Sequence, residues 1–288
     1  MWIESFMPNS SKTVLITGCS SGIGLTVALG LKQRGYGVVA SARKLQDVQR
    51  LRDMGLECLQ LDLTDSMSIQ TVVKKLHHLT DGKIYALFNN GAYGQPGAVE
   101  DLKREVLRAQ FETNLFGTME LTNHIIPMMR KQGYGRIIQN SSVLGFTALA
   151  YRGAYVASKF ALEGLTDTLR MELHGSGIHA ILIEPGPIES RFRANAYEAF
   201  KKNIDAQHSV HQAQYAAQEA RLTKEGPAAP FTLPADAVLK KVIHALESPR
   251  PKIRYYVTFP TYLFAMLRRF LPYRTMDKFM LKVSGGGN

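Results

Sequence analysis

Residues 13–24 read Thr13-Val-Leu-Ile-Thr-Gly18-Cys-Ser-Ser-Gly22-Ile-Gly24, and they carry the clearest structural signal in the chain. Residues 14–16 form an apolar run of the kind found in a strand that is buried on both faces of a parallel sheet. The glycine-rich turn follows at once, and the pattern of residues 25–34 predicts a helix that ends before Gly35. Glycines let the backbone approach a pyrophosphate, which the helix N-terminus then stabilises. The order of strand, turn and helix therefore predicts a dinucleotide-binding α/β domain.

A second motif, Tyr155-Val-Ala-Ser-Lys159, places a phenol and an ammonium four residues apart, on one face of a predicted helix. The lysine charge is expected to lower the pKa of the Tyr155 phenol, because a nearby cation favours the phenolate. Such a phenol can exchange a proton with an alcohol or a carbonyl compound. Ser142 follows the predicted buried strand 136–141, at the sheet edge where open α/β folds bind ligands. Alone, the pair also fits an exposed helix face, but the upstream glycine-rich motif favours the catalytic interpretation.

Taken together, the motifs resemble the classical short-chain dehydrogenase/reductase superfamily over about residues 12–260. The matching residues follow in order as Thr17-Gly18-x3-Gly22-x-Gly24, Asn89-Asn90-Gly91, Asn114, Ser142, Tyr155-x3-Lys159 and Pro185-Gly186. The chain departs from the family at Gly91-Ala92, where Ala-Gly is usual; both residues are small, so we expect the backbone still to approach the cofactor. The resemblance implies an α/β fold, a single doubly wound Rossmann-type domain. Its mainly parallel sheet would have about seven strands, with helices on both faces.

The whole chain, 1–288, is expected to form this single domain. Residues 12–188 would be the dinucleotide-binding and catalytic core, and 235–260 the last helix and strand. Residues 189–234 are the least family-like, and their length is typical of a substrate loop or lid; a helix is predicted over 194–221. Residues 261–288 form an amphipathic C-terminal tail, which could touch a membrane surface, close the substrate pocket or pack on its own domain.

The resemblance also implies the roles of individual residues. Tyr155 would be the general acid/base, and Ser142 would join it in binding the substrate oxygen. Lys159 would tune the tyrosine and hold the nicotinamide ribose, and Asn114 would hold a water that relays protons. The implied cofactor-binding residues are Gly18, Ser20, Ser21, Gly22, Ile23, Gly24, Arg43, Lys44, Asp62, Leu63, Asn89, Asn90, Gly91, Tyr155, Lys159, Pro185, Gly186 and Ile188.

The end of the predicted strand 36–42 bears on cofactor choice. An acidic residue there usually accepts hydrogen bonds from the adenosine ribose of NAD. Here Ala42 is followed by Arg43 and Lys44, which can bind a 2′-phosphate, so NADP(H) is the predicted cofactor; the alternative is two ordinary surface cations. By resemblance, Asp62 would meet the adenine amino group, although it also fits a turn or cap before the helix that follows.

The predicted function is transfer of a hydride between NADP(H) and an alcohol or carbonyl substrate. The resemblance is strongest to hydroxysteroid and retinol dehydrogenases and to bacterial aldehyde reductases, which favours an apolar aldehyde, ketosteroid or retinoid. One alternative is a non-catalytic NADP(H)-binding sensor, but the presence of all four catalytic residue types argues against it. Another is a membrane-surface lipid-handling protein that uses the basic tail.

Composition limits the remaining classes of protein. An apolar content of 45% with 20% charged residues fits a soluble globular protein. The net charge of +11 is accompanied by no nucleic-acid motif, so it is interpreted as solvated surface charge, with an anionic ligand or membrane as alternatives. With only Cys19 and Cys58, a disulfide framework is not expected and the cytoplasm is the predicted location. No N-terminal signal and no long apolar run are visible.

Two further expectations concern metals and partners. His208 and His211 are three residues apart without other residues at ligand spacing, so no metal site is predicted. By resemblance, the helices around Asn114 and Tyr155 would form a dimer surface, which predicts a homodimer or homotetramer.

Overall fold

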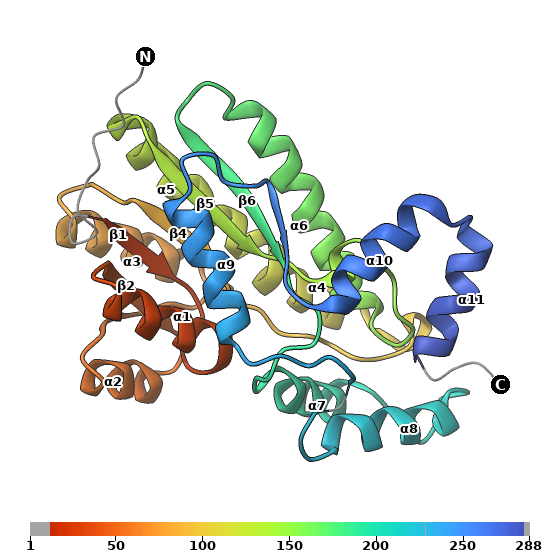
Figure 1. Ribbon diagram of the computed structural model, residues 1–288. Helices are drawn as coiled ribbons and strands as arrows, with labels where there is room; N and C mark the ends of the chain where they lie inside the picture. Colours follow the sequence, from red (N-terminus) through yellow and green to blue (C-terminus); the bar gives the residue numbers. More distant parts are fainter. Residues whose placement is uncertain (1–11, 228, 285–288) are drawn as a thin grey trace.

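The computed structural model describes residues 12–227 and 229–284; the expectations for residues 1–11 and 285–288 lie outside the described residues. A parallel sheet of seven strands runs through the molecule in the order β3-β2-β1-β4-β5-β6-β7 (Figure 1). This arrangement confirms the predicted Rossmann-type fold class. The strands are β1 (Thr13–Ile16), β2 (Gly37–Ala42), β3 (Glu57–Gln60), β4 (Ala86–Asn89), β5 (Gly135–Asn140), β6 (Ile178–Glu184) and β7 (Arg254–Tyr256).

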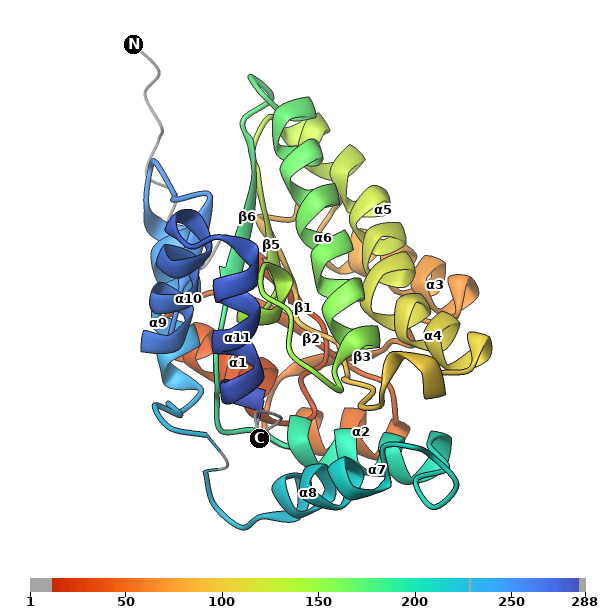
Figure 2. The same cartoon turned by 90° about the vertical axis from the view of Figure 1, so that its right-hand side faces the viewer.

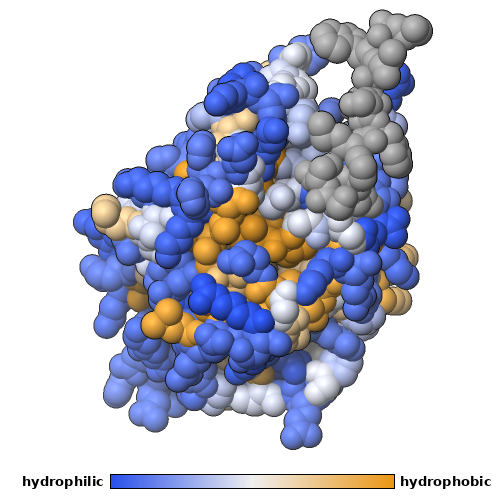
Figure 3. All heavy atoms as spheres, turned by 90° about the vertical axis from the view of Figure 1, so that its left-hand side faces the viewer, coloured by the Kyte–Doolittle hydropathy of each residue, from blue (hydrophilic) through white to orange (hydrophobic). Residues whose placement is uncertain are grey.

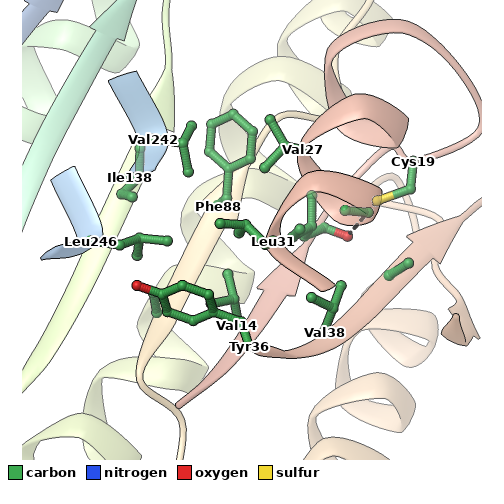
Figure 4. Packing of buried hydrophobic residues seen from close by; sticks show 14 of the residues in the cluster. Val14, Cys19, Val27, Leu31, Tyr36, Val38, Phe88, Ile138, Val242 and Leu246 are labelled. Atoms are coloured by element: carbon green, nitrogen blue, oxygen red, sulfur yellow. Dashed lines mark hydrogen bonds between the residues drawn. The ribbon is translucent and has the colours of Figure 1, made fainter. Parts of the chain in front are cut away.

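Helices cover both faces of the sheet, as Figure 2 shows. One face carries α1 (Gly22–Gln33), α2 (Leu45–Asp53) and α9 (Asp236–Glu247). The other carries α3 (Ser66–Leu79), α5 (Gly117–Gln132) and α6 (Gly153–Glu172). On the first face, Phe88 of β4 packs among Val27 and Leu31 of α1 and Val242 of α9 (Figure 4). Burial of these side chains on both faces explains why the central strands read as continuous apolar runs.

The strand order reverses beside β1, which pairs with β2 on one side and with β4 on the other. A crevice opens at the carboxyl ends of strands at such a reversal, because the connections leave toward opposite faces. Gly18, in the turn after β1, has φ +70°, and a Cβ there would lie 2.7 Å from the Cα of Gly91. The exchanged pair Gly91-Ala92 thus leaves the close approach of these two loops intact.

The helical region between residues 104 and 132 is interrupted. It contains α4 (Arg104–Phe111), a π-helical turn (Glu112–Phe116) and α5. The buried amide of Asn114 lies in this turn and forms hydrogen bonds with both backbone groups of Tyr93. Single π-helical turns inside helices are frequent at functional sites. The interruption therefore accompanies a tertiary contact that the helical pattern of the sequence does not reveal.

The prediction of a single helix over 194–221 is wrong, because this segment forms two helices, α7 (Phe192–Asn203) and α8 (Gln212–Thr223). Between them, Ser209 donates a 2.6 Å hydrogen bond to Asp101, and the buried Tyr215 of α8 donates another to the same carboxylate. These contacts with a distant loop hold the chain away from a helical path. In Figure 1, α7 and α8 lie together at the bottom of the molecule.

The tail begins earlier than predicted, since α10 spans Phe259–Phe270 and α11 spans Tyr273–Ser284. Phe264, Met276 and Met280 form a buried cluster with Val143 of the loop after β5. Packing of the tail on its own domain, one of the three interpretations, is therefore observed here, and contact with a membrane stays a prediction. None of the helices within the described ranges combines the length and apolar character that crossing a bilayer requires.

Charged and polar side chains cover most of the side that carries α2 and α3, while apolar residues gather near its middle (Figure 3). Cys19 and Cys58 are both buried and unpaired. Burial raises the pKa of the Cys19 thiol to about 12, so this thiol stays protonated and behaves as a small core residue.

Candidate active site

A cavity of about 840 Å³ lies at the carboxyl ends of the strands. It is lined by the loops after β1, β4, β5 and β6, by the lid segment 189–234 and by the tail helices. Its volume lies within the range of ligand pockets. The predicted site residues that line it are Gly18, Ser20, Ser21, Gly22, Ile23, Asn90, Gly91, Ser142, Tyr155, Lys159, Pro185, Gly186 and Ile188.

Ser142, Tyr155 and Lys159 come together in this cavity and are all buried. The Nζ of Lys159 lies 5.8 Å from the ring centroid of Tyr155 and donates a 2.7 Å hydrogen bond to the carbonyl of Asn140. Ser142 accepts a hydrogen bond from the backbone N–H of Leu144, which fixes its hydroxyl at the end of β5. The structure therefore places a phenol, a hydroxyl and an ammonium around one enclosed volume.

The pKa of Tyr155 differs from the value expected from its spacing to Lys159 in the sequence. Burial raises the pKa of Tyr155 to about 12, and a hydrogen bond with Ser142 only partly offsets this. Burial also lowers the pKa of Lys159 to about 8, against the negative charge of Glu163. Desolvation is the largest cause of both shifts, because both groups lie in a poorly solvated pocket. In this state Tyr155 keeps its proton at neutral pH, as a proton donor must.

Asn114 lies behind the catalytic group rather than among the residues that line the cavity. Its Nδ2 donates to the carbonyl of Tyr93 at 2.9 Å and to the Oγ of Ser158 at 3.2 Å, and its Oδ1 accepts from the N–H of Tyr93 at 3.1 Å. Ser158 directly precedes Lys159 on α6. The amide thus ties the loop after β4 to the catalytic helix, and its role in a proton relay stays a prediction.

The glycine-rich turn has the shape that a dinucleotide requires. Gly22 has φ +55°, and a Cβ there would lie 2.8 Å from the Cβ of Ser190, so a larger residue would collide with the lid. A Cβ on Gly24 would lie 2.3 Å from the carbonyl oxygen of Gly18. The turn leads directly into α1, whose first N–H groups lack partners within the helix. Backbone shape, cavity volume and helix N-terminus all fit a nicotinamide dinucleotide.

The remaining predicted cofactor residues lie outside the cavity lining. Arg43 and Lys44 are exposed at the end of β2, and the Arg43 charge is close enough to Tyr93 to offset in part the burial that raises that phenol's pKa. Asp62 accepts hydrogen bonds from the N–H and the hydroxyl of Thr64, the local turn role, whereas Asp65 caps α3. The carbonyl of Leu63 packs against Gly117, and Asn89 donates to Thr122 at 2.8 Å.

Several residues of the site were not anticipated from the sequence. Phe192 of α7 meets the Tyr155 ring edge-on, with the ring centroids 5.2 Å apart. Arg152, at the N-terminus of α6, and Arg221 of α8 also line the cavity. Of these three residues, only Arg152 could have been suspected from the sequence, because it lies three residues before Tyr155.

A cluster of charged side chains, partly buried, lies next to the loop that carries Ser142. Arg254 of β7 forms ion pairs with Glu163, Asp167 and Glu184. Glu163 also accepts a 2.6 Å hydrogen bond from Ser141, the neighbour of Ser142. The cluster thereby links β6, β7 and α6 to the loop that presents the Ser142 hydroxyl.

Known proteins share both the sequence pattern and the architecture. A family model described as short chain dehydrogenase matches residues 12–201. The uncharacterized oxidoreductase YbbO of Escherichia coli (strain K12) is 44% identical over 269 residues, which cover 93% of this chain and 94% of YbbO. Human 17-beta-hydroxysteroid dehydrogenase type 1 is 32% identical, with 90% and 78% of the two chains covered. A variant of actinorhodin polyketide ketoreductase with NADPH superposes with a TM-score of 0.70 at 25% identity, covering 87% of this chain and 97% of that one.

Proposed function

The chain belongs to the short-chain dehydrogenase family and is an oxidoreductase, and we propose that it interconverts an alcohol and a carbonyl compound with NADP(H). The observation that carries this proposal is the meeting of Tyr155, Ser142 and Lys159 in one cavity with the glycine-rich turn. When bound, the nicotinamide supplies or accepts the hydride. The protein must then orient the carbonyl carbon and manage the proton on its oxygen.

In the reducing direction, Tyr155 donates its proton to the carbonyl oxygen, and Ser142 donates a hydrogen bond to the same oxygen. The high pKa of the phenol favours this role, because the proton is present at neutral pH. Lys159, which already donates to the Asn140 carbonyl, stabilises the phenolate that forms and holds the nicotinamide ribose. Phe192 covers the tyrosine ring and limits the access of water.

The preference for NADP(H) rests on Arg43. Its side chain is exposed at the end of β2, and its charge acts on Tyr93, in the loop after β4. Gly91 and Ala92 of that loop line the cavity, and we expect the adenosine end of the cofactor to extend from there toward Arg43. A guanidinium there can hold a 2′-phosphate with two hydrogen bonds.

The cavity also supports an apolar substrate. Leu263, Phe264 and Met280 of the tail line it together with Leu144 and Leu149. Closure of the pocket by the tail thus accompanies its packing on the domain. An aldehyde, a ketosteroid or a retinoid has the apolar surface that such a wall would cover.

The test of this function is an assay of NADPH oxidation with a panel of aldehydes, ketosteroids and retinal, followed by loss of absorbance. Tyr155→Phe should lower kcat by roughly a hundredfold or more, because only the transferable proton is lost. NADPH binding by the variant, measured by fluorescence, should remain. Tyr273→Phe, which changes a phenol that is 84% exposed, is the matched control and should behave as wild type.

More than a tenth of wild-type activity in Tyr155→Phe would remove this phenol from the role of main acid. NADPH binding without turnover of any carbonyl compound would favour the sensor alternative. Light scattering tests the predicted homodimer or homotetramer independently, and a monomer at micromolar concentration would contradict it.

A further inference from the structure

The cavity carries an imbalance of charge that the reaction described above does not use. Among the described residues that line it, Glu189 is the only carboxylate. The cations that line it are Arg152, Lys159, Arg191, Arg193 and Arg221. Lys159 has a catalytic role in the proposed mechanism, and the four arginines have none. A pocket with this surplus attracts an anion, because the low-dielectric walls focus the positive field.

Arg152 and Arg221 have no ion pair with a carboxylate within the described part of the chain. Arg152 donates one hydrogen bond of 2.9 Å to the carbonyl of Tyr151, which leaves most of its donors free. Burial, and then the like charge of Arg221, lowers the pKa of Arg152 to about 10. Burial and the charge of Arg193 likewise lower the pKa of Arg221. Removing water from a charged group is costly without a counterion, so two partly buried guanidinium groups whose charges act on each other favour the binding of an anion.

The two arginines stand at the catalytic end of the cavity. Arg152 immediately precedes the first residue of α6 and lies about one helical turn before Tyr155. Arg221 belongs to α8, and its neighbour Leu222 packs in one cluster with Ala154. The glycine-rich turn, by contrast, belongs to the N-terminus of α1. Because of this placement, the anion that Arg152 and Arg221 bind is expected to belong to the substrate rather than to the phosphates of the cofactor.

The wall formed by the tail has the opposite character. Leu263 and Phe264 of α10 and Met280 and Val283 of α11 present apolar side chains to the same cavity. One wall of the cavity, formed by the lid, is therefore positively charged, and the wall formed by the tail is apolar. A ligand that satisfies both walls is an amphiphile with an acidic group and an apolar chain.

We propose that Arg152 and Arg221 bind an acidic group of the substrate, so that the enzyme acts on carbonyl compounds with both a carboxylate-like anion and an apolar chain. This inference rests on the proposed alcohol–carbonyl function and names its substrate class. The hydride transfer itself is unchanged; the anion only positions the carbonyl beneath Tyr155.

The experiment uses straight-chain oxo-acids of one chain length, with the keto group at different positions, each paired with its methyl ester. The ratio of kcat/KM for acid and ester should favour the acid by about tenfold or more for at least one position. Arg221→Gln and Arg152→Gln should each lower that ratio about tenfold. Arg221→Lys should keep part of it, because the charge remains. Arg250→Gln removes an exposed cation outside the cavity and should leave the ratio unchanged.

A binding measurement separates this inference from the proposed function. Dodecanoate should bind the wild-type protein more tightly than methyl dodecanoate in calorimetry, and Arg221→Gln should abolish the difference whether or not turnover occurs. Turnover of ketones with equal efficiency for acids and esters would overturn the inference and leave the function standing. Loss of NADPH affinity in Arg221→Gln with an unchanged acid-to-ester ratio would also overturn it, because the cations would then serve the cofactor.

Discussion

Two settings of arginine adjoin the catalytic helix α6: a paired side at Glu163 and Asp167 in the middle of the helix, and an unpaired side at its N-terminus. Arg254 is surrounded by Glu163, Asp167 and Glu184, whereas Arg152 and Arg221 face the cavity without a carboxylate. Burial works to lower the pKa of Arg254, but Glu163, Glu184 and Asp167 raise it above its ordinary value. Burial lowers the pKa of Arg152 with no carboxylate to oppose it. Arg254, which has counterions, therefore holds neighbouring elements together. Arg152 and Arg221, which have none among the described residues, are available to a ligand.

The largest expected effect is on the paired side. Arg254→Ala would leave the buried carboxylate of Glu163 without its cation and would remove the ion pair with Asp167. Breaking a buried pair by removing one partner costs about 3–5 kcal/mol of unfolding free energy. Urea denaturation at pH 7 measures this loss, with Arg250→Ala as a control that removes an exposed cation. A change below about 1 kcal/mol would show that the cluster is not a structural support.

Arg43 extends the comparison to an exposed cation without an ion pair among the described residues. It should discriminate between cofactors, because one charge-assisted contact with a 2′-phosphate contributes about 1.5–3 kcal/mol. The wild type should therefore prefer NADPH over NADH by at least about tenfold in kcat/KM, and Arg43→Ala should remove most of that preference. Lys44→Ala should have a smaller effect. Equal efficiency with both cofactors in the wild type would refute the assignment of Arg43.

A third test concerns the pH dependence of the paired side. Burial, followed by the charge of Glu163, raises the pKa of Glu184 well above its ordinary value of 4.5. The folded state then binds a proton that the unfolded state releases, so the Glu184 contribution to stability is lost as the pH rises above that ordinary value. Glu184→Gln should flatten the decline in unfolding free energy between pH 5 and pH 8 by about 1 kcal/mol. Parallel profiles for the variant and the wild type would contradict the raised pKa.

The smallest expected effect is on the unpaired side. Arg152→Gln should leave the unfolding free energy within about 1 kcal/mol of wild type, or raise it, because no carboxylate loses its partner. The same urea titration at pH 7 measures it beside Arg254→Ala. A loss as large as that of Arg254→Ala would mean that Arg152 is a structural residue, and the contrast between the two sides would fail.

The dinucleotide-binding half of the fold could be predicted because its signals are local. The strand, glycine-rich turn and helix of residues 13–33 are contiguous, and Tyr155 and Lys159 are one helical turn apart. Backbone sterics and hydrophobic periodicity act over such short distances, so the pattern of the chain carries them. The order of the motifs along the chain then indicated the parallel sheet.

The lid, the π-helical turn and the cavity charge depended on contacts between distant segments. Ser209 binds Asp101 where the predicted lid helix is broken, and Asn114 lies in the π-helical turn while bound to Tyr93. Arg152 and Arg221 are separated along the chain by α6, β6 and α7, and they come close only because α8 packs near the N-terminus of α6. Spacing in the sequence determined which chemical groups this protein has. Three-dimensional packing determined which of them lose their water and which find a partner, because desolvation and pairing depend on every neighbour in space.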